Sequence, residues 1–180
     1  NFSDDQQQLR DAVAKWVDKG YGFERRREIE KAGGFSREAW DELAELGLGG
    51  LYIPEDEGGL GMGPVEGMVV MEELGRGIVL EPLAQAFIAG AVLAGHADQD
   101  TKDNWLPRIA GGQALVVLAH QERKARYKLD VCEAKAAQAG SGWSVSGTKS
   151  VVPAGDEADA FLVPAQANGK IALFLVERAA

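Results

Sequence analysis

The chain has 180 residues, of which 46% are hydrophobic, and this length and composition suit one globular domain or two small ones and exclude wholesale disorder. The 28 acidic residues outnumber the 19 basic ones and give a net charge of −9, which disfavours a nucleic-acid binder because phosphate contacts need clustered cations. A single cysteine and two histidines exclude an internal disulfide and a cysteine-based zinc site, and they disfavour a multi-histidine metal site.

The first predicted helix begins close to the N-terminus. Ser3 and Gln6 form a capping box, in which each side chain bonds to a backbone N–H of the other residue. Leu9, Val13 and Trp16 follow with the spacing of one helix face. The pattern therefore predicts an amphipathic helix.

A second helix is predicted from the cap residue Ser36. Phe35 before the cap and Trp40 inside the helix form a hydrophobic staple, and Gly47 is a typical stop signal. The basic run 25–27 between the two helices is interpreted as a solvated charged face.

Three more helices are predicted before the chain changes character. Pro64 opens the third at the one helical position where proline is well tolerated, and Gly75 ends it. Pro82 opens a fourth helix that is apolar on almost every side and is therefore expected to be buried. Thr101 caps a short fifth helix, which Pro107 bends or ends.

After Gly112 the spacing becomes that of strands. Asn168-Gly169 is the strongest hairpin signal in the chain, and Gly140 to Gly142 is a second predicted turn. The β-rich segments are 114–119, 143–145, 160–163 and 171–176. Helices followed by strands predict an α+β fold, with an all-α helical domain at 1–113 and an antiparallel β-barrel or sandwich domain at 114–180.

The residues alone reveal no self-contained active site. The sequence has no Ser/His/Asp series and no dinucleotide fingerprint, and the glycine-rich segment 58–63 lacks the lysine and the preceding strand of a phosphate loop. No run of about 18 apolar residues and no signal peptide is visible. We therefore expect a cytoplasmic protein without a membrane span.

Several short strings occur together in an order that resembles the acyl-CoA dehydrogenase family. Residues 53–61 contain the pattern P-E-x-x-G-G-x-G, and 72–76 are similar to the family's E-E-[LI]-[GA]-[RK] helix end. Residues 106–112 resemble its L-P-x-[LI]-x-x-G stretch. The segments 142–149 and 154–159 are similar to its G-x-x-[LI]-x-G-x-K and [NG]-G-x-x-A-D patterns.

The resemblance implies a three-part architecture and a flavin-dependent reaction. Family members have an N-terminal helical domain, a central β domain and a C-terminal helical bundle, with FAD bound between the last two. They dehydrogenate the α,β bond of an acyl-CoA thioester, and electron-transfer flavoprotein is the expected acceptor. The bundle, which carries the catalytic carboxylate, is absent from this chain. We therefore expect an incomplete β domain, an unassigned catalytic base and an inactive fragment.

The resemblance also assigns contacts within this chain. It places two segments against the flavin, and it places other side chains on the CoA side and around the acyl group. The cofactor-contacting residues it implies are Leu118, His120, Gln121, Val151, Val152 and Pro153. The substrate-contacting residues it implies are Arg126 and Tyr127 for CoA and Leu83 and Phe87 for the acyl group.

The chain departs from the family pattern at the flavin contacts. Gln121 stands where the family has Thr or Ser before a glutamate, which is Glu122 here. Val151 replaces a tryptophan that shields the flavin, and Pro153 replaces a Thr or Ser that bonds near flavin N5. These departures resemble the small subunit of pimeloyl-CoA-type dehydrogenases, so an oligomer of like or unlike dehydrogenase chains is expected. The open alternatives are a catalytically degenerate structural subunit, and a flavin monooxygenase or nitroalkane oxidase on the same fold.

Overall fold

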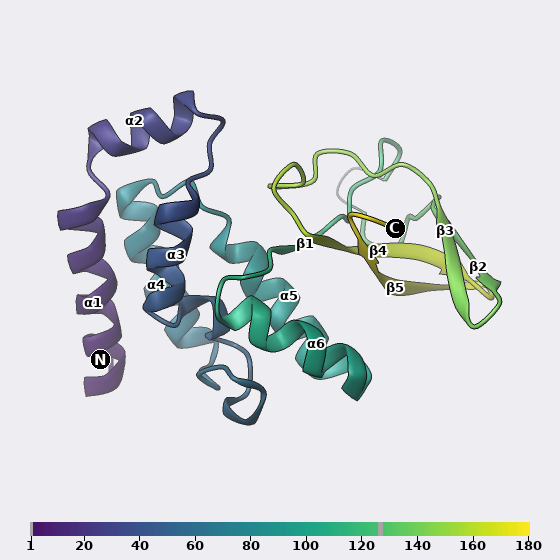
Figure 1. Cartoon of the computed structure of the whole chain (residues 1–180), viewed down its shortest axis with the longest axis horizontal. Helices are drawn as coiled ribbons and strands as arrows, with labels where there is room; N and C mark the ends of the chain where they lie inside the picture. Colours follow the sequence, from purple (N-terminus) through teal and green to yellow (C-terminus); the bar gives the residue numbers. More distant parts are fainter. Residues whose placement is uncertain (1, 126–127) are drawn as a thin grey trace. The chain divides into compact units, whose positions relative to one another are not determined.

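The computed structural model describes residues 2–125 and 128–180. The chain divides into two compact units, Asn1–Gln113 and Ala114–Ala180. The first unit contains the helices and the second contains the strands (Figure 1). This arrangement confirms the predicted α+β class. The assignment of the two units to the family's helical domain and to an incomplete β domain stays a prediction.

Six α-helices and two short 3₁₀ helices occur in the described part of the first unit. None of the described helices is long and apolar enough to cross a membrane. The α-helices are α1 (Asp4–Gly20), α2 (Phe23–Lys31), α3 (Arg37–Glu45), α4 (Pro64–Gly77), α5 (Leu83–His96) and α6 (Gln99–Ala110), and the 3₁₀ helices are η1 (Leu48–Gly50) and η2 (Glu55–Glu57).

The helix signals that depend on neighbouring residues are confirmed. Ser3 Oγ accepts from the Gln6 N–H at 3.2 Å, and Gln6 Oε1 accepts from the Ser3 N–H at 2.9 Å, which completes the capping box of α1. Ser36 caps α3. Gly47 follows the end of α3 with a φ of 77°, a left-handed conformation that glycine adopts without a steric penalty.

The predicted bounds of two helices are wrong. α6 begins after Asp98, whose carboxylate accepts from the Thr101 N–H at 2.8 Å. The cap of this helix is therefore Asp98 and not Thr101, the residue predicted from the sequence. Pro107 lies inside α6, and the Gly111 N–H bonds to its carbonyl at 2.9 Å. α4 continues beyond the predicted stop at Gly75. Each helix retains enough hydrogen bonds and buried side chains to outweigh the local signal.

The helix α2 was not predicted, and its basic run is not simply solvated. Arg25 bonds through both terminal nitrogens to the Glu42 carboxylate at 2.9 and 3.0 Å and also reaches the Gly20 carbonyl. Arg26 donates to the Gly77 carbonyl at 2.8 Å. These partners lie on other helices or in loops, so the tertiary structure stabilises a segment with little apolar periodicity.

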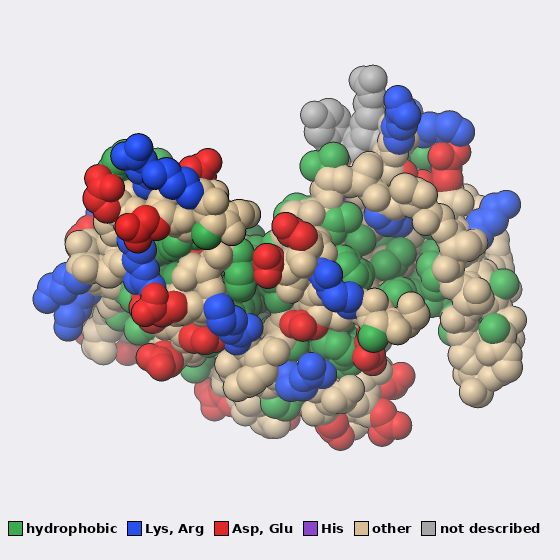
Figure 2. Space-filling model, turned by 45° about the horizontal axis from the view of Figure 1, so that its top comes forward, with side chains coloured by type: hydrophobic (Ala, Val, Ile, Leu, Met, Phe, Trp, Pro, Cys, Tyr) green, Lys and Arg blue, Asp and Glu red, His purple; other side chains and the backbone are tan. Residues whose placement is uncertain are grey.

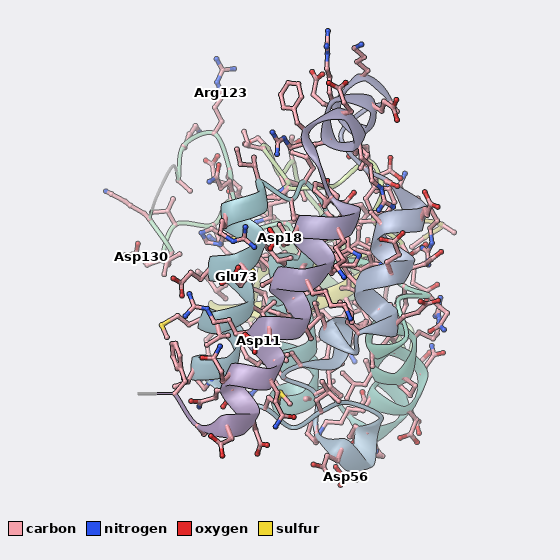
Figure 3. The ribbon with its side chains drawn as sticks, turned by 90° about the vertical axis from the view of Figure 1, so that its left-hand side faces the viewer. Asp11, Asp18, Asp56, Glu73, Arg123 and Asp130 are labelled. Atoms are coloured by element: carbon pink, nitrogen blue, oxygen red, sulfur yellow. The ribbon has the colours of Figure 1, made fainter. Side chains whose placement is uncertain are left out.

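The helices α1 and α4 are joined by a partly buried ion network. Glu73 is 5% exposed and accepts from Arg10 Nε at 2.9 Å and Arg76 Nε at 2.8 Å. Arg76 also bonds to Asp18 on α1 at 2.7 Å, and Figure 3 labels Asp18 and Glu73 on the two helices. Hydrogen bonds from Arg10 and then Arg76 lower the pKa of Glu73 despite its burial. In Figure 2, acidic and basic side chains are interspersed on the visible face of this unit.

The described part of the second unit contains a five-stranded mixed sheet, so the predicted antiparallel pairing is wrong in part. The strands are β1 (Val116–Leu118), β2 (Lys135–Ala139), β3 (Gly142–Ser146), β4 (Ala160–Ala167) and β5 (Lys170–Glu177). β4 pairs in parallel with β1 and at one position with β2, whereas β2–β3 and β4–β5 are antiparallel. The long connections after β1 and β3 permit the parallel pairs, which short turns cannot join.

Both predicted hairpin turns are confirmed. Asn168 and Gly169 have φ values of 50° and 76°, as a type I′ turn requires, and they connect β4 to β5. Gly140, with a φ of 62°, lies in the turn between β2 and β3. The strand β2 itself was not predicted, because its alanines and polar residues are poor strand signals.

We expect Glu73→Gln to lower the free energy of unfolding of the helical unit by about 1–2 kcal/mol, because Arg10 and Arg76 lose a buried anion but remain partly exposed. Urea unfolding followed by tryptophan fluorescence measures the change. The matched control is Asp41→Asn, which removes an exposed i,i+4 pair with Arg37 and should cost under about 0.5 kcal/mol. Equal effects of the two variants would contradict the assigned role of Glu73.

Candidate functional site

The structure brings two of the predicted segments together at the end of β1. Leu118 is the last residue of β1, and the Ala119 N–H bonds to the Leu162 carbonyl at 2.9 Å. Two residues later, the Gln121 carbonyl accepts from the Ser150 N–H at 2.8 Å. The last residue of the segment 118–121 is therefore bonded to the residue directly before 151–153, although about thirty residues of chain separate the two segments.

The second segment has an unusual backbone conformation. Val151 is 80% exposed and has a φ of 52°, which is strained for a β-branched residue. Ala154 also has a positive φ, of 53°, and the Gly155 N–H bonds to the Val152 carbonyl at 3.1 Å. Such strain costs on the order of 1–3 kcal/mol and persists only where the surrounding structure fixes the chain.

Arg178 fixes the chain that follows this segment. Its Nε donates to the Ala158 carbonyl at 2.5 Å, and its Nη2 donates to the carbonyls of Gly155 and Asp156 at 2.7 and 2.6 Å. One guanidinium therefore satisfies three carbonyls of the loop that leads into β4. The planar arrangement of its donors suits this kind of multiple contact.

The Glu122 carboxylate fixes the chain that precedes the segment. Glu122 is 4% exposed, and its Oε1 accepts from Lys149 Nζ at 2.6 Å and from the Ala134 N–H at 3.0 Å. Its Oε2 accepts from the Glu133 N–H at 2.5 Å. The carboxylate thus connects three stretches of chain: the exit of β1, the approach to β2, and the segment before Val151.

These contacts keep Glu122 ionised. Burial by itself raises the pKa of a carboxyl group, but the hydrogen bonds from Lys149 and from the amides of Ala134 and Glu133 lower the pKa of Glu122 to about 2. Cys132 lies beside the pair, with Sγ 3.5 Å from Glu122 Oε1, and burial raises the pKa of its thiol. Cys132 is buried and bonds to polar groups, including the carbonyls of Ala134 and Pro164.

The remaining predicted site residues belong to other parts of the chain. Leu83 and Phe87 are 2% and 5% exposed in the helical unit, where the Phe87 ring lies 4.9 Å from that of Tyr52. Arg126 and Tyr127 lie outside the described residues. Arg123 near them is exposed and extends away from its loop in Figure 3. A role in substrate binding stays a prediction for all four predicted residues.

The pairing of Glu122 with Lys149 was not predicted from the sequence. Both residues belong to family-like strings, but 27 positions separate them. No periodicity relates two residues at this distance, and only tertiary contacts, such as the neighbouring bond from the Ser150 N–H to the Gln121 carbonyl, bring them together. Their places in those family-like strings were the one available signal.

The two segments present groups that suit a flavin in part. Within the described part of the chain, His120 Nε2 is buried and has no hydrogen-bond partner. Gln121 is half-buried and has both a donor and an acceptor. Val151 offers exposed apolar surface. Polar groups beside an apolar surface suit the flavin, a heteroaromatic ring with one polar edge. Pro153 has no N–H, so it cannot donate a hydrogen bond to that ring.

We expect the ion pair at Glu122 to make stability depend on pH in the acidic range. The pKa of Glu122 is about 2 in the folded state, below the ordinary value of 4.5. The contribution of the ion pair to the free energy of unfolding is therefore fully present above pH 4.5 and is lost as the pH falls toward 2. It amounts to about 3 kcal/mol. Urea unfolding at several pH values should show a shallower acid slope for Glu122→Gln than for the wild type.

The control for this measurement is Glu133→Gln, which changes an exposed carboxylate in the same loop and should leave the slope unchanged. Parallel curves for the wild type and Glu122→Gln would show that Glu122 is not held ionised by its partners.

Comparison with known proteins gives a consistent set of relatives. The acyl-CoA dehydrogenase FadE12 of Mycobacterium tuberculosis is 34% identical over 183 residues, which cover 97% of this chain and 47% of the relative. Mitochondrial isovaleryl-CoA dehydrogenase of Pongo abelii is 29% identical and covers 98% of this chain and 44% of its own length. The chain thus spans about half the length of these curated relatives.

The fold and the helical unit agree with this comparison. The ChsE4-ChsE5 complex from Mycobacterium tuberculosis contains a chain with a TM-score of 0.87 and 29% identity, and the match covers 98% of this chain and 48% of that one. The family sequence model described as acyl-CoA dehydrogenase, N-terminal domain, matches residues 3–113. Because this match covers more than half of the sequence, the chain belongs to the acyl-CoA dehydrogenase family.

Proposed function

We propose that this chain is part of an FAD-dependent acyl-CoA dehydrogenase, or of one subunit of such an enzyme, with the catalytic base outside the chain. The observation that carries the proposal is the hydrogen bond of 2.8 Å between the Ser150 N–H and the Gln121 carbonyl. It joins the end of one segment that the family resemblance assigns to the flavin to the residue directly before the other. Membership of the family supports the same reaction class.

In this proposal, the residues of the β unit bind and orient the flavin. The Gln121 amide bonds to the polar edge of the ring, and the His120 nitrogen, which has no partner among the described residues, provides a second polar contact. Leu118, Val151 and Val152 supply apolar contacts, and Pro153 contributes shape without a donor. The bound FAD supplies the chemistry of accepting a hydride, whereas the protein positions the reactants and excludes water.

The substrate of the proposed enzyme is an acyl-CoA thioester. The names of FadE12 and isovaleryl-CoA dehydrogenase, both related over almost the whole of this chain, support this class. Leu83 and Phe87 line the acyl side, and Arg126 and Tyr127 contact CoA. Electron-transfer flavoprotein accepts the electrons, and the enzyme is an oligomer.

A second candidate is a structural subunit that completes a hetero-oligomer without its own flavin. Val151 and Pro153 favour it, because the first cannot stack as an aromatic ring does and the second has no N–H. A solved structure that is 29% identical to this chain is described as a complex of ChsE4 with ChsE5. That description supports an assembly of two different dehydrogenase chains.

Spectroscopy of the purified protein separates the two candidates. The enzyme should be yellow when purified or after addition of FAD, and its acyl-CoA should bleach the flavin absorbance in the absence of oxygen. The structural subunit should stay colourless alone but co-purify with a second dehydrogenase chain. A protein that stays colourless with FAD and associates with no such chain would contradict both candidates.

We also expect Val151→Trp to strengthen FAD binding, because a stacked aromatic ring adds about 1 kcal/mol, or roughly a fivefold change in the dissociation constant. Quenching of flavin fluorescence measures the affinity. Ile171→Trp is the matched control, since Ile171 is an exposed apolar residue of β5 and should not change binding. A weaker or unchanged affinity of Val151→Trp would argue against flavin contact at this position.

A further inference from the structure

The Glu122–Lys149 pair combines deep burial with an unusual number of contacts. The Lys149 side chain is 9% exposed and that of Glu122 is 3% exposed. The carboxylate accepts hydrogen bonds from one ammonium group and two backbone amides. These partners lie in two other stretches of chain, one containing Glu133 and Ala134 and one containing Lys149. Together with the stretch that carries Glu122, the carboxylate therefore connects three segments.

The pair also lies directly beside the candidate flavin segments. Glu122 follows Gln121, and Lys149 precedes Ser150, whose N–H bonds to the Gln121 carbonyl. Beyond Ser150, the chain enters the left-handed conformation of Val151. The strained residue is therefore held between the Lys149 anchor and the turn that the Gly155 N–H closes on Val152.

Net stability is a poor explanation for a pair of this kind. A buried ion pair loses the hydration of both charges, and well-packed apolar residues of similar volume are often as stabilising or more so. An ion pair with fixed hydrogen bonds does, however, tolerate only one arrangement of its segments, and this specificity is a documented use of buried charges. The location of the pair identifies which segments it specifies.

We propose that Glu122 and Lys149 are positioning residues that hold the segments 118–121 and 151–153 at the spacing needed to bind the flavin edge. Neither residue contacts the flavin in this proposal; each acts through the chain it holds. The role in flavin binding rests on the proposed function, whereas the effect on the two segments does not. The ligand concerned is FAD.

Hydrogen exchange of the full chain, measured by mass spectrometry, tests the positioning directly. Lys149→Met should raise exchange in peptides covering 119–123 and 149–152 roughly tenfold, because local opening is no longer opposed by the pair. Lys149→Arg, which restores the cation, should recover most of the protection. Lys124→Met is the matched control, since it removes an exposed ion pair with Glu133 in the same loop and should change neither segment.

A double variant separates positioning from stability. Glu122→Leu with Lys149→Met replaces the pair by apolar residues, and it should recover thermal stability relative to Lys149→Met but not the protection of the two segments. A tenfold weaker FAD affinity should accompany the lost protection. If the double variant recovers both stability and protection, or if Lys149→Met raises exchange evenly over the whole β unit, the pair is merely structural and the proposal is wrong.

The exchange measurement keeps this proposal distinct from the proposed function. If the wild-type protein does not bind FAD but the Lys149→Met variant loses protection of the two segments, the positioning of the segments is supported and their role in flavin binding is overturned. If the wild-type protein binds FAD and the Lys149→Met variant binds it with the same affinity, the proposed function is supported and the positioning role is overturned.

Discussion

A buried carboxylate that must stay ionised is the constraint on which the candidate site depends. Glu122 lies where a lone charge would be strongly unfavourable, so its position requires a cation and backbone donors at fixed places. Lys149 and the amides of Glu133 and Ala134 meet this requirement. Because these groups come from three stretches of chain, satisfying one charge fixes the relative positions of all three.

The helical unit uses charge in a related way but at lower burial. Glu73 accepts from two arginines and joins α1 to α4, and Glu42 bonds to Arg25 and to the Trp16 ring N–H at 2.7 Å. The arginines of these networks stay partly exposed. Water can therefore solvate them when a partner is lost, which makes these networks less demanding of exact geometry than the pair in the β unit.

The backbone of the β unit is strained at Val151, which has a positive φ. A β-branched, mostly exposed residue in the left-handed region has no local reason to adopt that conformation. The anchors on both sides provide a tertiary reason: Lys149 on one side and the loop held by Arg178 on the other. The same position is where the family resemblance assigns flavin contact, so the predicted effect of valine there is the loss of aromatic stacking.

The sequence by itself determined the features that depend on residues close together in the chain. The capping box at Ser3, the stop at Gly47 and the turn at Asn168-Gly169 were predicted because each involves a few neighbouring residues whose geometry is fixed locally. The family resemblance arose from short strings of the same kind, and the match of residues 3–113 confirms it. The flavin and substrate contacts drawn from that resemblance stay predictions.

Only the tertiary structure decided the features whose partners lie far apart in sequence. The helix α2, the continuation of α6 through Pro107 and the parallel pairing of β1 with β4 all depend on contacts that no local pattern records. The pair of Glu122 with Lys149 is the clearest case, because neither residue alone indicates a partner 27 positions away. Folding brings such residues together through contacts between distant segments, and a local sequence pattern cannot encode those contacts.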